Sequence, residues 1–217
     1  VTRYLKGELP TFSMTDIEKI VEELGIPVTS YWKKQLATLP KHEIGVVKAS
    51  GKLLENDALS QLCAEMSYLG NSGFVMPLVI GGGMQYDKLT EGSRMVEGLR
   101  VTPPSLMKQI ADIAVKNQEI VAQELIKQGI PAATVPASTI VAKPIGIVKT
   151  IAGVVDYGCT GDVTSIHTKP IIDLIHQGVV PVISHVGSWQ EGKCNINATT
   201  VAKEVMKYLH AKKLMIV

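Results

Sequence analysis

The chain has 217 residues, 46% of them hydrophobic, which is enough for one α/β domain with a full core. Its formal net charge is only +2 and it holds no cluster of lysine and arginine, so we expect no nucleic acid as a partner. The three cysteines are far apart and lack CxxC spacing, which argues against a disulfide framework or a zinc site and favours a reducing compartment. No apolar stretch reaches the length of a membrane span, and residues 1–10 lack a signal-peptide core, so we expect no membrane association.

The predicted elements begin with two helices, at residues 15–23 and 30–39. In the first, apolar residues recur at helical spacing, and a glycine or proline ends each segment. We therefore expect residues 1–41 to form a helical arm used for packing or oligomerisation, ahead of a domain at residues 42–217.

Strands and helices then alternate along the chain. Residues 44–48 and 74–80 predict two buried strands, because they are apolar in the manner of a parallel sheet covered on both faces. Residues 57–69 predict the helix between them. A short helix is expected after a run of three glycines, and a long helix is expected at residues 103–128, where two prolines suit the first turn.

The second half of the chain continues the pattern. Residues 132–156 are rich in Val, Ile and Pro and predict short strands joined in hairpins. The further predicted elements are strands at 162–166, 179–184 and 214–217 and helices at 169–177 and 195–210. This alternation predicts a three-layer αβα sandwich with a mostly parallel sheet. Because the chain stops within a predicted strand, we expect it to be the N-terminal half of a larger unit.

Two segments at the ends of predicted strands suit an anion. Lys48-Ala49-Ser50-Gly51-Lys52 follows the first strand, where small residues let the backbone approach a ligand and lysine adds positive charge. Gly81-Gly82-Gly83 follows the second strand, and ligands in open α/β sheets bind at the carboxyl ends of strands. The alternatives are a plain strand-to-helix turn for the first segment and a turn that needs positive φ for the second.

Two further positions suit a carboxylate ligand. Arg100 lies shortly before the long helix and can clamp a carboxylate with two parallel hydrogen bonds, although a surface pair with Glu91 or Glu97 is the alternative. Asn195 and Asn197 precede a predicted helix, where one amide can hold a carboxylate or both can act as helix caps. The histidines are dispersed without metal-binding spacing, so we expect no metal site within the chain.

Taken in order, several segments carry a family resemblance. They are Lys48-Ala49-Ser50-Gly51, Ile80-Gly81-Gly82-Gly83, Gly98-Leu99-Arg100-Val101-Thr102, residues 181–187, Asn195-Ile196-Asn197-Ala198-Thr199 and residues 211–214. In this order and spacing they resemble the acetylglutamate kinase branch of the amino acid kinase family over about residues 43–217. The match to that family's Gly-Leu-Arg-Val-Thr segment is complete.

The resemblance implies a reaction and a set of roles. Members of that family transfer a phosphoryl group from ATP, with Mg²⁺, to the side-chain carboxylate of N-acetylglutamate in arginine biosynthesis. Lys48 and Gly51 would then be catalytic, with Lys48 stabilising charge on the transferring group. Gly81, Gly82 and Gly83 would line the substrate site, and Arg100 and Asn195 would hold a substrate carboxylate. The nucleotide lobe would lie beyond the last residue, so this chain alone is not expected to be a competent kinase.

Three positions depart from the family pattern: Ser50 replaces a glycine, Ile80 a histidine and Thr199 an aspartate. A hydroxyl at Thr199 cannot carry the negative charge that organises the catalytic lysines. The alternative is therefore a catalytically impaired, arginine-sensing regulatory domain of an N-acetylglutamate synthase. The intact segment around Arg100 argues against a kinase for aspartate or carbamate. The resemblance further implies a homo-oligomer and a cytoplasmic location, or the mitochondrial matrix in a eukaryote.

Overall fold

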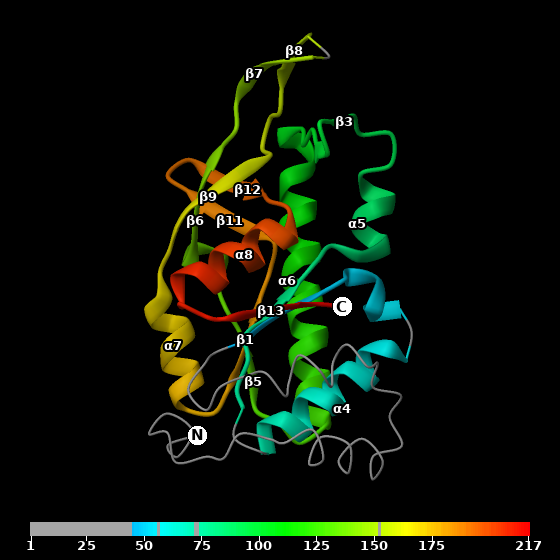
Figure 1. Cartoon of the computed structure of the whole chain (residues 1–217). Helices are drawn as coiled ribbons and strands as arrows, with labels where there is room; N and C mark the ends of the chain where they lie inside the picture. The colour runs from blue at the N-terminus through cyan, green and yellow to red at the C-terminus, as the bar shows by residue number, and fades with distance from the viewer. Residues whose placement is uncertain (1–44, 56, 72–73, 152) are drawn as a thin grey trace.

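A computed structural model describes residues 45–55, 57–71, 74–151 and 153–217. The expected helical arm at residues 1–41 lies outside these ranges. At the centre is a five-stranded sheet with the order β13-β1-β2-β10-β5, in which every neighbouring pair is parallel (Figure 1). Its strands are β1 (Gly45–Ala49), β2 (Leu78–Ile80), β5 (Ala132–Thr134), β10 (Val180–Ile183) and β13 (Lys213–Ile216).

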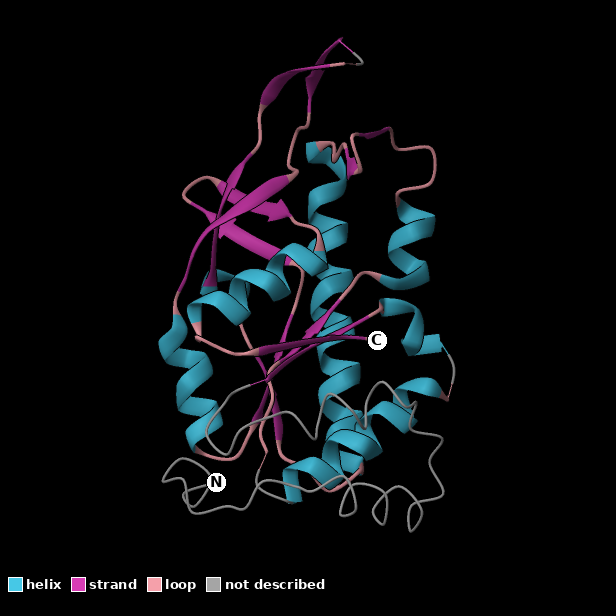
Figure 2. Ribbon diagram, in the orientation of Figure 1, coloured by secondary structure: helices cyan, strands magenta, loops and turns pink. Residues whose placement is uncertain are grey.

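Helices cover both faces of this sheet, as Figure 2 shows. α4 (Ala58–Asn71) packs against α6 (Pro104–Lys127), and α6 in turn contacts β5 and β10. α7 (Thr168–His176) contacts β10, while α8 (Ala198–Tyr208) contacts β1, β2 and β13. None of the helices in the described ranges combines the length and the apolar composition that crossing a bilayer requires. The predicted three-layer αβα sandwich with a mostly parallel sheet is confirmed.

The middle strands of the sheet explain why their sequences lack alternation. Val46, Val47, Leu78, Val79 and Ile80 are entirely buried, because helices lie on both sides of them. A strand covered on both faces needs apolar residues at every position, whereas a strand with one wet face alternates. Two short helices follow these strands directly: the 3₁₀ helix η1 (Gly51–Glu55) after β1 and α5 (Gly83–Leu89) after β2.

A smaller sheet and two hairpins extend the molecule at one end, the upper end in Figure 1. The smaller sheet has the strand order β12-β11-β6-β9. Its strands are β6 (Ile140–Pro144), β9 (Gly161–Ile166), β11 (Val186–Trp189) and β12 (Gly192–Asn195), and the hairpins are β3–β4 (Met95–Val96, Leu99–Arg100) and β7–β8 (Ile147–Thr150, Gly153–Asp156).

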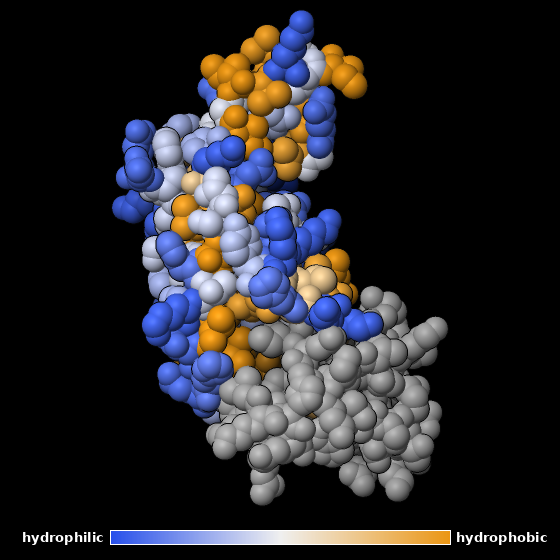
Figure 3. Space-filling view, turned by 60° about the vertical axis from the view of Figure 1, so that its left-hand side comes forward, coloured by the Kyte–Doolittle hydropathy of each residue, from blue (hydrophilic) through white to orange (hydrophobic). Residues whose placement is uncertain are grey.

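The β7–β8 hairpin projects from the body of the protein. Apolar side chains gather at this end of the space-filling view (Figure 3). Ile147 and Val154, on its two strands, are 70% and 71% exposed. The hairpin therefore adds apolar area to the surface, whereas Val155 on β8 is buried in a small cluster with Val96 and Tyr157.

Several predicted boundaries differ from those of the structure. The helix expected at residues 195–210 begins at Ala198, because the side chain of Asn197 caps it by accepting a hydrogen bond of 2.8 Å from the Thr199 amide. Asn195 instead ends strand β12. The β11–β12 hairpin was not predicted, and the strand expected at residues 74–80 is restricted to β2. The hairpin prediction for residues 132–156 is confirmed for β7–β8, whereas β5 joins the parallel sheet.

Candidate functional site

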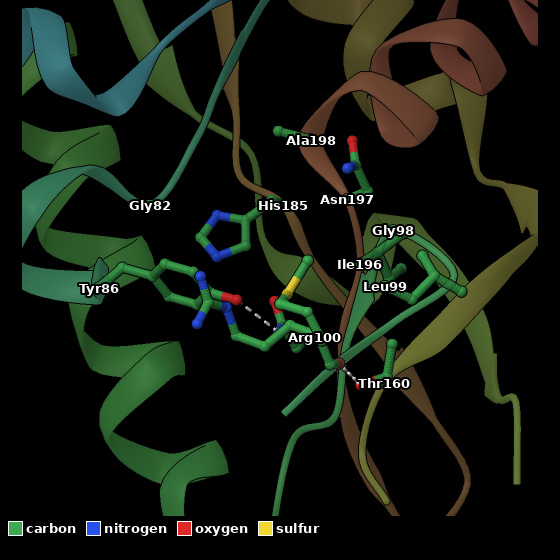
Figure 4. Close-up of a pocket in the computed structure, with 12 residues that line it drawn as sticks. Gly82, Tyr86, Gly98, Leu99, Arg100, Thr160, His185, Ile196, Asn197 and Ala198 are labelled. Atoms are coloured by element: carbon green, nitrogen blue, oxygen red, sulfur yellow. Dashed lines mark hydrogen bonds between the residues drawn. The ribbon is translucent and has the colours of Figure 1, made fainter. Parts of the chain in front are cut away.

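Two adjoining cavities lie at the carboxyl ends of β1, β2 and β10, the edge at which open α/β sheets bind ligands. The Lys48 cavity encloses about 260 Å³ between the loops after β1 and β2 and the start of α8. The Arg100 cavity encloses about 200 Å³ between α5, β4, β12 and the segment after β10 (Figure 4). Four residues line both cavities: Gly82, Tyr86, Asn197 and Ala198.

The Lys48 cavity collects the predicted anion-binding residues. Lys48, Gly51 and the Gly81-Gly82-Gly83 run all line it, together with Ser50 and Thr199. The amide of Gly81 donates to the Ala49 carbonyl at 3.2 Å and is therefore occupied. The amides of Gly51, Gly82 and Gly83 make no hydrogen bond to another residue of the described ranges, so they remain as donors for a ligand.

Lys48 is held in this cavity without a matching negative charge. Partial burial lowers the pKa of its ammonium group, because desolvation disfavours the charged form. The ion pairs formed among the described residues involve Lys127, Lys169 and Lys207 and not Lys48. An anion bound beside Lys48 would therefore restore the charge that burial disfavours.

The glycines of the two loops are required by a backbone contact. A Cβ atom added to Gly51 would lie 2.1 Å from the amide nitrogen of Gly83 and 2.6 Å from the Gly81 oxygen. Gly83 also has a positive φ of 74°, which side chains rarely adopt. Gly81 is different, because its added Cβ would meet no atom closer than 3.4 Å. The expected turn with positive φ is therefore present at Gly83, beside the free amides.

A residue of α6 fixes the same loop from behind. The buried side chain of Asn117 donates from Nδ2 to the carbonyl oxygens of Gly81 and Gly82, at 3.2 and 2.8 Å. Binding the carbonyls from this side leaves the amides of Gly82 and Gly83 directed elsewhere. Asn117 was not predicted from the sequence, since a polar residue inside a long helix gives no local signal for this role.

Arg100 reaches its cavity from β4. Its Nη1 donates to the Thr90 carbonyl at 3.0 Å, and its guanidinium carbon lies 5.6 Å from the centre of the Tyr86 ring. Cation–π contact and one hydrogen bond hold the group in place while its other N–H donors remain for a ligand. Arg100 is half-buried and makes no salt bridge with Glu91 or Glu97, which was the alternative raised from the sequence.

Asn195 joins three segments behind Arg100. Its Nδ2 donates to the Tyr86 hydroxyl and to Thr102 Oγ1, at 2.9 Å each. The Thr160 hydroxyl donates to the Arg100 carbonyl, and it can accept a hydrogen bond from the Thr102 hydroxyl at 2.9 Å. Because both N–H groups of the amide are used, Asn195 offers the cavity its carbonyl oxygen and no donor.

His185 is the second residue that the sequence analysis missed. It follows β10 at the ligand-binding edge of the sheet, is 3% exposed and lines the Arg100 cavity (Figure 4). Its ring meets the Tyr86 ring edge-on, with 5.5 Å between centroids. Desolvation by burial lowers the pKa of His185 to about 4, so the ring is neutral at pH 7. The sequence signal that could have identified His185 was its position directly after a predicted buried strand.

The charges around the two cavities are mostly positive. Arg100 lines one cavity without any aspartate or glutamate, and Lys48 and Lys52 line the other with Asp87 as its one carboxylate. The described ranges hold no group of three or more His, Cys, Asp or Glu side chains suited to a metal ion. The arrangement suits a ligand with a carboxylate and a second anionic group.

Known proteins resemble this chain in sequence and in fold. The model of the amino acid kinase family matches residues 43–217. The chain is similar to the acetylglutamate kinase of Bacteroides thetaiotaomicron, with 33% identity over 181 residues that cover 79% of this chain and 67% of that protein. It is also similar to the bifunctional protein argC, mitochondrial, of Dictyostelium discoideum, with 30% identity over 191 residues that cover 86% of this chain and 22% of that protein.

A solved structure shows the same fold. The N-acetylglutamate synthase of Neisseria gonorrhoeae, complexed with coenzyme A and N-acetyl-glutamate, matches with a TM-score of 0.71 and 23% identity. The match covers 81% of this chain and 41% of the synthase. The chain thus spans well under half the length of the synthase and about two thirds of the Bacteroides kinase.

The loop contact leads to a stability prediction. Gly51→Ala places a methyl group against the backbone of Gly83, so we expect a loss of about 1–3 kcal/mol in the free energy of unfolding. Gly81→Ala is the matched control, because its methyl group finds ordinary contact distances. Urea unfolding followed by circular dichroism measures both, and equal midpoints for the two variants would contradict the contact.

The role of Asn117 can be separated from general helix packing. Asn117→Ala removes both bonds to the glycine loop, so we expect faster amide hydrogen exchange at residues 81–84. Gln118→Ala is the control, because Gln118 is equally buried but donates to Val135 and Val182, at 2.9 and 2.7 Å. Faster exchange of the glycine loop in the Gln118 variant as well would show that the effect is not specific to Asn117.

Proposed function

The chain belongs to the amino acid kinase family, and we propose that its two cavities form the substrate site of an acetylglutamate kinase-type domain. The Arg100 cavity would bind N-acetylglutamate, and the Lys48 cavity would receive the phosphoryl group of ATP. The observation that carries this proposal is that Gly82, Tyr86, Asn197 and Ala198 line both cavities. A carboxylate that extends from the first cavity can therefore meet a phosphoryl group in the second.

The proposed ligand matches the donors of the Arg100 cavity. Arg100 keeps N–H donors for a bidentate bond to one carboxylate of the ligand, and no acidic side chain competes with it. Asn195 contributes its carbonyl oxygen and positions Tyr86 and Thr102, since both of its N–H groups are already bonded. Arg100 would thus bind the charged carboxylate of the ligand, and uncharged groups such as the Asn195 carbonyl would contact its other side.

The Lys48 cavity fits a phosphoryl group. Free amides of Gly51, Gly82 and Gly83 can bind its oxygens, and the Lys48 ammonium can offset the charge that develops as the group moves to the substrate carboxylate. ATP is the phosphoryl donor of this family, commonly with Mg²⁺. Asp87 is the one carboxylate that lines this cavity.

The unpaired state of Lys48 favours a second candidate function. Thr199 lines the cavity where the family pattern has an aspartate, and the lysine lacks a carboxylate partner within the described ranges. A domain with this defect could serve as the arginine-sensing regulatory domain of an N-acetylglutamate synthase. In either case we propose residues 42–217 as the substrate-binding lobe and residues 1–41 as an arm of a homo-oligomer, in the cytoplasm or the mitochondrial matrix.

Ligand binding tests the shared part of both candidates. Arg100→Gln removes the proposed clamp, and charged hydrogen bonds of this kind contribute about 1.5–3 kcal/mol, so we expect N-acetylglutamate to bind about tenfold more weakly or worse. Arg94→Gln is the control, because Arg94 is exposed and does not line the cavity. Isothermal titration of the full-length protein measures both affinities. A similar affinity for the two variants would rule out the Arg100 clamp.

The charge at position 199 tests the kinase candidate. Thr199→Asp adds a carboxylate to the Lys48 cavity, where it would raise the lowered pKa of Lys48 and keep the ammonium charged. We expect formation of acyl phosphate by the full-length protein, trapped as the hydroxamate, to rise about tenfold or more. Thr200→Asp adds the same charge to α8 outside the cavity and should not help. No hydroxamate from either variant, together with a calorimetric signal for arginine, would favour the sensor domain.

A further inference from the structure

His185 is a buried polar side chain that the proposed function has not used. Neither of its ring nitrogens has a hydrogen-bond partner among the described residues, although the side chain is fully enclosed apart from the cavity that it lines. Nine-tenths or more of buried polar groups in proteins are hydrogen-bonded, because an unmade bond costs free energy. The missing partner of His185 is therefore expected inside the Arg100 cavity.

The ring is also held in a fixed position. Its backbone carbonyl accepts a hydrogen bond of 3.1 Å from the Ile196 amide, and its ring packs edge-on against Tyr86, which lines both cavities. Tyr86 is in turn fixed by Asn195 through the bond to its hydroxyl. A side chain placed in this way can contact a ligand without first losing rotational freedom.

The electrostatics of the site define what the ring can bind. Burial lowers the pKa of His185 to about 4, because desolvation disfavours the charged ring, so the ring is neutral at pH 7. The neutral ring has one N–H donor and one nitrogen that accepts a hydrogen bond, and neither nitrogen has a partner among the described residues. The accepting nitrogen therefore requires a donor from a ligand in the cavity.

We infer that His185 is a specificity-determining residue that accepts a hydrogen bond from the amide N–H of an N-acylated amino acid in the Arg100 cavity. The inference rests on the proposed function and adds the group that recognises the acylamino end of the ligand. Arg100 binds the carboxylate, and His185 distinguishes an acylated amine from a free one. A free amino acid would carry an ammonium group into a cavity that has no aspartate or glutamate to pair with it.

A pair of ligands isolates this contact. N-acetyl-L-glutamate and glutarate carry the same two carboxylates, but glutarate has no acylamino group. His185→Phe keeps a ring against Tyr86 and removes the acceptor, so we expect N-acetyl-L-glutamate to bind the full-length protein about tenfold more weakly, with glutarate unchanged. His176→Phe is the control variant, because His176 is exposed on α7 and away from both cavities.

The outcomes of the titration separate the two proposals. Equal weakening of both ligands would mean that His185 only supports the cavity, and no weakening of either would mean that a water molecule satisfies the ring; both results overturn the inference alone. If the unmodified protein binds neither ligand, the proposed function fails and the inference fails with it. His185→Gln, which keeps an uncharged acceptor, should bind N-acetyl-L-glutamate within about threefold of the unmodified protein.

A measurement on the unmodified protein does not depend on the variants folding. Nitrogen NMR of the His185 ring reports which nitrogen carries the proton and whether the other accepts a hydrogen bond. We expect the chemical shift of the unprotonated nitrogen to change when N-acetyl-L-glutamate is added and to remain unchanged when glutarate is added. A ring that is doubly protonated at pH 7, or that does not respond to N-acetyl-L-glutamate, would overturn the inference.

Discussion

The backbone contact between Gly51 and Gly83 is the constraint on which both cavities depend. β1 and β2 are parallel neighbours, so the loops that follow them leave the sheet at the same edge and must share space. Without side chains at these two positions the loops close together, and their free amides face one cavity. The same closure places α5, and with it Tyr86, against the second cavity. The sheet thus fixes the site through a contact that only glycine permits.

Tyr86 connects the residues that would recognise a ligand. Arg100 lies over its ring, His185 meets the ring edge-on, and Asn195 bonds its hydroxyl. These residues come from β4, from the segment after β10 and from β12, which are far apart in the sequence. One face of the arrangement is cationic and the other is uncharged, which matches an anion with a neutral polar substituent. Thr199 lines the Lys48 cavity, and Lys48 forms no ion pair with a carboxylate of the described ranges.

Much of this could be predicted from the sequence, because the strongest patterns are local. Continuous apolar runs indicated the buried strands, and the glycine run and the segment around Arg100 indicated the family. The roles within the site were less accessible. Asn195 was expected to cap a helix or to donate a hydrogen bond to a ligand carboxylate. In the structure it ends strand β12, and both of its side-chain N–H groups are bonded within the protein. Asn117 and His185 act through contacts that sequence spacing does not encode, and only the folded arrangement brings them to the cavities.

The exposed β7–β8 hairpin lies near the middle of the chain, and none of its described residues belongs to the main hydrophobic core. Strands from the two sides of this division are interleaved in the central sheet: β13 pairs with β1, and β10 lies between β2 and β5. A break between β7 and β8 would therefore yield two fragments, each of which supplies strands to one shared sheet. Co-expressed as separate polypeptides, they would have to reassemble to form either cavity, since Lys48 and Arg100 lie on one fragment and His185, Asn195 and Thr199 on the other. The hairpin is thus a suitable place to divide this domain into two polypeptides. Ligand binding by the mixture would then show that the two fragments had reassembled.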